Sequence, residues 1–85
     1  MVIKMKVTVN RQLFIEHISP IPANNGISIL VADGILSAAS FDHGVITRIP
    51  AYVIKDGQVF LSNDEWNNFI SMIETHQATY IDIDI

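Results

Sequence analysis

Residues 27–39 read ISILVADGILSAA, a sequence that contains its own turn. Asp33-Gly34 separates two apolar runs, and this dipeptide is the strongest short-range signal for a β-hairpin, because a type I′ turn needs positive φ at both central residues. Pairing Ala32 with Ile35 across the turn sorts the remaining side chains onto two faces. The face that we predict to lie in the core holds Ile27, Ile29, Val31, Leu36 and Ala38.

A second Asp-Gly pair, at residues 56–57, also stands between apolar runs. The same turn chemistry predicts a second hairpin, in which Lys55 pairs with Gln58 and Val53 pairs with Phe60. The sheet would therefore contain two hairpins that follow one another along the chain.

The strand that leads into the second turn, residues 44–54, is apolar on both sides, which indicates that both sides are covered. Either the helix covers one side and the core the other, or the side that carries Arg48 and Tyr52 is a protein interface. Pro50 predicts that this strand lies at a sheet edge or contains a bulge, because proline cannot donate a hydrogen bond to a neighbouring strand.

The clearest helix signal begins at Ser62. Ser62 to Glu65 forms a capping box, in which the Ser62 hydroxyl accepts from the Glu65 amide and the Glu65 carboxylate accepts from the Ser62 amide. Apolar side chains then recur at the i, i+3, i+4 and i+7 positions of one helix face. We predict one amphipathic helix over about residues 63–75, packed on the sheet through Trp66, Phe69, Ile70 and Ile73.

Both ends of the sequence alternate between apolar and polar residues, as strands do. Residues 2–9 carry Lys4 and Lys6 on the outer face, and residues 79–85 carry Asp82 and Asp84 there. Opposite charges on neighbouring strands stabilise a sheet by about 0.2–1 kcal/mol per pair. We therefore predict that the last strand lies beside the first, with the two lysines across from the two aspartates.

Residues 10–19 have two interpretations. Asn10 could cap a short helix with an apolar stripe, or Asn10-Arg11 could turn a hairpin. The hairpin would place Met5 opposite Glu16 and so mix the faces of the strands, which favours the helix. The stripe of that helix would be Leu13, Phe14, His17 and Ile18.

The chain has 85 residues, which is the size of a single domain. The elements predict an α+β domain over residues 1–85, with a mainly antiparallel sheet of five to six strands. Charged residues make up 16% of the chain and apolar residues 49%, whereas an average domain is about 25% charged. Such sparse charge predicts apolar surface that is hidden in a homo-oligomer or against a protein partner.

Several function classes find no support in the sequence. His17, His43 and His76 lack metal-ligand spacing, there is no cysteine, and neither a nucleophile elbow nor a phosphate-binding loop is present, so we expect no metal, no cofactor and no enzyme activity. Five basic residues against nine acidic ones do not make the basic patch that nucleic-acid binding needs. The absence of cysteine, a signal peptide and a membrane-spanning stretch predicts a cytoplasmic protein.

The remaining hypothesis is a small protein-binding module that occupies a partner's surface, as an inhibitor or adaptor encoded by a phage or mobile element would. Alternatively, the chain is a structural subunit that assembles through its apolar edge strands, or it sequesters a small molecule between subunits. Interfaces favour arginine and aromatic residues among aliphatic ones. The predicted partner-binding residues are Phe41, His43, Ile46, Arg48 and Tyr52.

Overall fold

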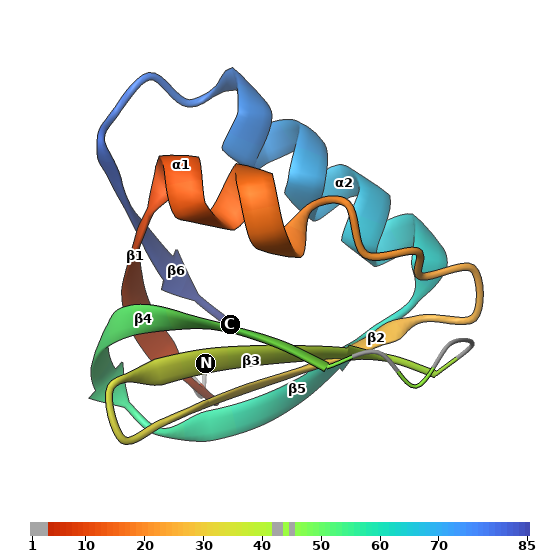
Figure 1. Cartoon of the computed structure of the whole chain (residues 1–85), viewed down its shortest axis with the longest axis horizontal. Helices are drawn as coiled ribbons and strands as arrows, with labels where there is room; N and C mark the ends of the chain where they lie inside the picture. The colour runs from red at the N-terminus through yellow and green to blue at the C-terminus, as the bar shows by residue number, and fades with distance from the viewer. Residues whose placement is uncertain (1–3, 42–43, 45) are drawn as a thin grey trace.

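The computed structural model describes residues 4–41, 44 and 46–85. These residues form an α+β fold in which six antiparallel strands make one sheet in the order β5-β2-β3-β4-β1-β6 (Figure 1). The elements in chain order are β1 (Lys6–Asn10), α1 (Arg11–Leu13), the π-helical segment η1 (Phe14–Ile18), β2 (Ile27–Ala32), β3 (Ile35–Ser40), β4 (Ile46–Lys55), β5 (Gly57–Leu61), α2 (Asn63–Thr75) and β6 (Tyr80–Asp84).

The long strand β4 curls the sheet. Its first half pairs with β3 as far as Pro50, and its second half pairs with β1 from Ala51 onward. Pro50 thus lies where the pairing of β4 changes from β3 to β1. Proline has no backbone N–H group, so the strand lacks a hydrogen-bond donor at this junction. Strand β4 as a whole is not an edge strand, because it pairs with both β3 and β1, but Pro50 itself is paired on one side only, opposite Ile35 of β3.

Of the two predicted hairpins, the described residues contain the first. Asp33 and Gly34 both have positive φ, at 54° and 76°, and β2 pairs with β3 in the predicted register from Ala32 opposite Ile35. The second prediction is wrong, because β5 does not pair with β4. It crosses to the other side of the hairpin and pairs with β2, so that Gln58 lies opposite Leu30.

Helix α2 has the predicted bounds and the predicted capping box. The Ser62 amide donates to Glu65 Oε1 at 3.0 Å, and the Glu65 amide donates to Ser62 Oγ at 3.2 Å. The hydrogen bond from the Ser62 backbone, followed by that from its side chain, lowers the pKa of the Glu65 carboxyl below its ordinary value. Trp66 and Ile73 of this helix are buried.

A second helical segment covers residues 11–18, which confirms the helix interpretation favoured for residues 10–19 and adds a second helical element to the one predicted on the sheet. Asn10 caps it by accepting from the Leu13 amide at 3.0 Å, and the Ser19 amide donates to the Phe14 carbonyl at 2.9 Å to close the π-helical turn. Phe14 and Ile18 are buried, while His17, which was placed on the apolar stripe, is exposed.

The first and last strands are neighbours, as predicted. Lys6 lies opposite Asp84, whereas Thr8, not a lysine, lies opposite Asp82 and donates a hydrogen bond to its carboxylate. Lys4 precedes β1, and its backbone amide donates to the Ile85 carbonyl. The predicted pairing is therefore correct for the strands and for one of the two lysines.

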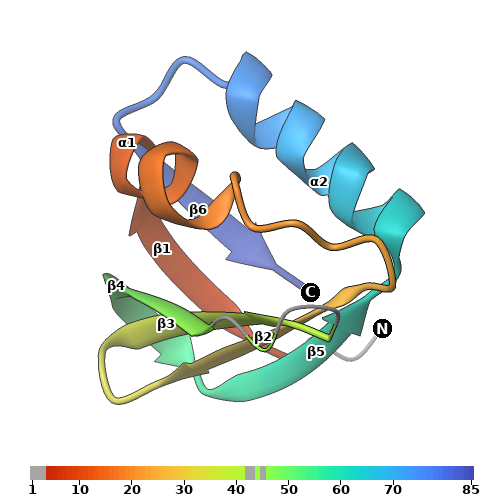
Figure 2. The same cartoon turned by 45° about the vertical axis from the view of Figure 1, so that its right-hand side comes forward.

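The two helical segments lie side by side over the concave side of the sheet (Figures 1 and 2). The core fills the space between them and the sheet. All five side chains predicted for the core face of the first hairpin are buried. Strands β1 and β6 add a second wall through Val7, Val9, Ile81 and Ile83, and the helices close the space with Phe14, Ile18, Trp66 and Ile73.

Candidate functional site

The side of the sheet that faces away from both helical segments carries many exposed apolar side chains. Because side chains alternate along a strand, every second residue of β2–β5 points to this side. We call these residues, taken in β4 as far as Tyr52 and with Phe41 at the end of β3, the outer face: Ser28, Leu30, Ala32, Ile35, Ser37, Ala39, Phe41, Ile46, Arg48, Pro50, Tyr52, Gln58 and Phe60.

The strand registers arrange the outer face in rows. One row runs from Phe60 through Ser28 and Ala39 to Ile46, so an aromatic and an aliphatic side chain stand at its two ends. The next row runs from Gln58 through Leu30 and Ser37 to Arg48. Gln58 Nε2 donates to Ser28 Oγ at 2.9 Å and links the two rows.

An aromatic pair forms one corner of the outer face. The rings of Phe41 and Phe60 meet edge to face with centroids 5.1 Å apart. Phe60 also lies over Gly26, where a Cβ atom would come within 2.5 Å of the ring and the backbone has φ of 103°. Glycine at position 26 therefore allows the Phe60 ring to pack closely against the start of β2.

Arg48 is the only charged residue of the outer face. Among the described residues it makes no hydrogen bond or ion pair. A hollow of about 230 Å³ lies beside it, with a lining of Gly34, Ile35, Arg48, Ile49 and Pro50. Arg48 thus lines a hollow whose other lining residues are apolar or glycine.

The structure places four of the five predicted partner-binding residues on the outer face, and His43 lies outside the described residues. Ile46, Arg48 and Tyr52 share one side of β4, and Phe41 reaches this face at the end of β3. Of the two alternatives for the second side of β4, cover by the helix is wrong, because both helical segments lie on the concave side of the sheet (Figure 2).

Sequence reasoning missed three large, exposed apolar side chains of the outer face, which are Leu30, Ile35 and Phe60. All three are at least 40% exposed. Alternation along β2 and β3 could have identified Leu30 and Ile35, because they lie opposite the core face of the hairpin. Phe60 could not be placed in this way, because its strand was assigned to the wrong neighbour.

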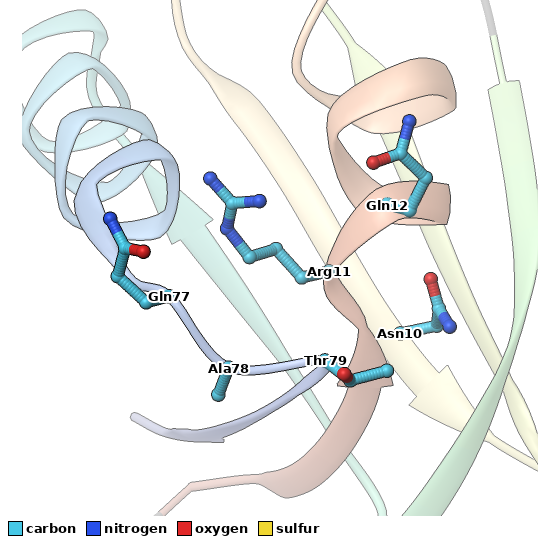
Figure 3. A pocket seen from close by; sticks show the side chains of 6 residues that line it. All are labelled: Asn10, Arg11, Gln12, Gln77, Ala78 and Thr79. Carbon is cyan, nitrogen blue, oxygen red and sulfur yellow. The ribbon is translucent and has the colours of Figure 1, made fainter.

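A polar hollow of about 220 Å³ lies at the other end of the molecule, between the start of α1 and the loop that follows α2 (Figure 3). Its lining includes Arg11, Gln12, Gln77 and Thr79. Arg11 Nε donates to the Ile73 carbonyl at 3.1 Å and Nη2 donates to the Glu74 carbonyl at 2.7 Å. A cation bound to the last carbonyls of α2 is favourable with the helix dipole, so Arg11 has a structural role here.

We expect Arg11→Met to destabilise the fold by about 1–2 kcal/mol, because it removes two charge-assisted hydrogen bonds from a partly buried helix end. Urea unfolding at neutral pH measures this loss. Arg48→Met is the matched control, since it makes the same change at an arginine without a partner among the described residues. Equal losses in the two variants would contradict the assignment of Arg11 as the cap of α2.

A third hollow, of about 340 Å³, lies between α2 and the ends of β5 and β6. Leu61, Phe69, Met72 and Ile85 give it a largely apolar lining, and Glu65, its one charged residue, is held in the capping box. Asn68 is its other polar lining residue, so with Glu65 engaged in the capping box the hollow offers few of the convergent polar groups that ligand sites usually combine with an apolar cavity.

The described part of the chain contains no group of three or more His, Cys, Asp or Glu side chains that could hold a metal ion. Within the same residues, no helix has the length and apolar character needed to cross a membrane. In comparisons with known proteins, no family model and no curated protein matches this chain. We therefore infer function from the geometry of the chain itself.

Proposed function

We propose that this chain is a non-catalytic protein-binding module that docks a partner on the outer face, as an inhibitor or adaptor does. The observation that carries the proposal is the exposure of apolar side chains on a sheet whose opposite side already packs a complete core. Strands of an antiparallel sheet that face water normally alternate apolar and polar residues. Strand β4 instead presents Ile46, Pro50 and Tyr52 outward.

The size of the patch supports a protein partner. Phe41, Tyr52 and Phe60 are 64%, 73% and 56% exposed. With roughly 150–250 Å² for each aromatic side chain, the three together expose about 300–500 Å². The largest apolar patch of an ordinary monomer is about 300–600 Å², and the aliphatic members of the outer face add to the aromatic area. The outer face can therefore supply much of the roughly 800 Å² that each partner contributes to a standard interface.

The shape of the outer face favours a macromolecule over a small molecule. Ligand pockets are usually about 300–1,000 Å³ and enclose most of their ligand. The hollow beside Arg48 is about 230 Å³ and holds only a part of that volume. It suits one side chain of a partner whose remaining contacts spread over the rows of the sheet.

The proposal is tested by selecting displayed random short peptides on the wild-type protein and measuring their affinities for variants. We expect the selected peptides to lose at least about tenfold in affinity for Ile46→Asp, because a carboxylate in an apolar contact cannot be desolvated cheaply. Fluorescence anisotropy with synthetic peptides gives the affinities, and circular dichroism verifies that the variant is folded.

Met72→Asp is the matched control, because Met72 and Ile46 are both 54% exposed and Met72 lies on α2, away from the outer face. We expect this variant to bind the peptides as the wild type does. Peptides that bind Ile46→Asp as tightly as the wild type, or a selection that enriches no binder, would contradict the proposal.

A homo-oligomer that forms through β5 is the second candidate. Strand β5 stands at one end of the sheet order, and its sequence GQVFL has neither charge nor proline. Uncharged edge strands can pair with another chain, whereas β6, at the other end, carries Asp82 and Asp84. Light scattering over a range of concentrations distinguishes the candidates, because β5 pairing predicts a mass that is a multiple of 9.5 kDa.

A further inference from the structure

We propose that the partner presents a carboxylate to Arg48 together with an apolar side chain that fills the hollow beside it. This inference rests on the proposed function and names the chemistry of the surface that the outer face binds. The occupant is thus a protein segment with an Asp or Glu set among apolar residues.

The first step is the position of Arg48. It lies between Ile46 and Pro50 on the outer side of β4 and opposite Ser37 of β3. A partner that covers the apolar neighbours also removes water from the guanidinium group. Because a buried charge without a partner is strongly unfavourable, docking on this face requires a group that pairs with Arg48.

The second step is the absence of such a group within the outer face. Among the described residues, β2–β5 carry no acidic side chain on this side, Asp82 of β6 on the same side accepts a hydrogen bond from Thr8, and Arg48 has no hydrogen-bond or ion-pair partner. The planar guanidinium group binds a carboxylate through two parallel hydrogen bonds, which gives the contact both strength and direction. The missing group is therefore best supplied by an Asp or Glu of the partner.

The third step is the hollow. Ile35 and Pro50 form apolar walls within reach of the same arginine, and the space of about 230 Å³ is open to the outer face. An apolar side chain of the partner can enter this space while a neighbouring carboxylate reaches Arg48. Hot spots of protein interfaces are enriched in arginine and aromatic residues and cluster in well-packed pockets that exclude water.

Charge also decides between this occupant and two others. A second copy docked face to face would bring two Arg48 side chains into one interface, and the described outward residues of β2–β5 offer neither of them an acid, which is unfavourable. Nucleic-acid backbones need several basic residues, and the outer face has one in a chain of net charge −4. A protein segment with a carboxylate meets neither objection.

The test uses the peptides selected on the wild-type protein, synthesised with each Asp or Glu and again with the corresponding Asn or Gln. We expect the amide form to bind the wild type at least about tenfold more weakly, as expected when a hydrogen bond between charged groups is lost. In Arg48→Met, the two forms should bind with equal affinity, because the group that distinguishes them is gone. Lys4→Met is the control for the general loss of a positive charge and should retain the difference.

Different results overturn the inference and the proposed function. If binding is sensitive to Ile46→Asp but the acid and amide forms bind equally, the outer face binds protein and the inference about Arg48 is wrong. If no peptide loses affinity for the Ile46→Asp variant, the proposed function is contradicted as well. A wild-type protein that is dimeric in light scattering while Ile46→Asp is monomeric would assign the face to a second copy and overturn the inference.

Discussion

Phe14→Ala is expected to destabilise the protein by about 3–5 kcal/mol, the usual cost of removing a buried phenylalanine ring. Phe14 is fully buried, and its ring lies 6.2 Å from that of Trp66 and 5.8 Å from that of Phe69. Trp66 and Phe69 in turn stack on one another at 5.9 Å. The ring of Phe14 therefore joins η1 to α2, and its loss leaves a cavity where the two helical segments meet above the sheet.

Urea unfolding, followed by tryptophan fluorescence and circular dichroism, measures the effect. A chain of this length has a total stability of about 4–13 kcal/mol, so the alanine variant can be largely unfolded and Phe14→Leu provides a milder second point. Phe60→Ala makes the same change on the outer face, where the ring is more than half exposed, and should cost less than half as much. A larger loss for Phe60 would mean that the aromatic corner, and not the helical layer, holds the fold together.

Features that adjacent residues determine were predictable from the sequence. The Asp33-Gly34 hairpin and the α2 capping box each depend on residues only a few positions apart, so their chemistry is visible in a short window. The pairing of β1 with β6 is long-range, yet the opposite charges of Lys6 and Asp84 indicated it. The unpartnered side of β4 was also visible, as alternation placed Ile46, Arg48 and Tyr52 together.

The pairing of β5 was predicted wrongly from the sequence, which placed it beside β4. Strand β4 pairs with β3 over its first half, as far as Pro50, and with β1 from Ala51 onward, while β5 pairs with β2 on the other side of the first hairpin. No local sequence pattern indicates which strand β5 pairs with, because its neighbour depends on the curl of the whole sheet. The pairing of β5 with β2 places Phe60 opposite Ser28 and so within the outer face, which explains why Phe60 was missed as a site residue.

The curl also changes the role of Gly57. A type I′ hairpin would need positive φ at this residue, but Gly57 is not among the residues with positive φ. Its backbone instead lies against the segment that precedes β1. A Cβ atom at position 57 would overlap the Lys4 carbonyl oxygen and lie 2.9 Å from the Met5 Cβ, and Met5 is fully buried. Glycine is needed here so that the starts of β5 and β1 can approach each other closely.

Gly57→Ala is therefore expected to destabilise the protein at the upper end of the range of about 1–3 kcal/mol for overpacked sites, because the opposing atom belongs to the backbone and cannot rotate away. Substitution by asparagine distinguishes this steric explanation from one in which Gly57 is needed for a turn, since asparagine tolerates positive φ but still has a Cβ atom. Gly34, in the true hairpin, has φ of 76°, and a Cβ atom there would lie 3.8 Å from its nearest neighbour, which is an ordinary contact. Thermal and urea unfolding should thus show a small loss for Gly34→Asn and a large one for Gly57→Asn. Tolerance of asparagine at both positions would mean that residues 56–57 form a turn after all and that β5 does not pass beside the start of β1.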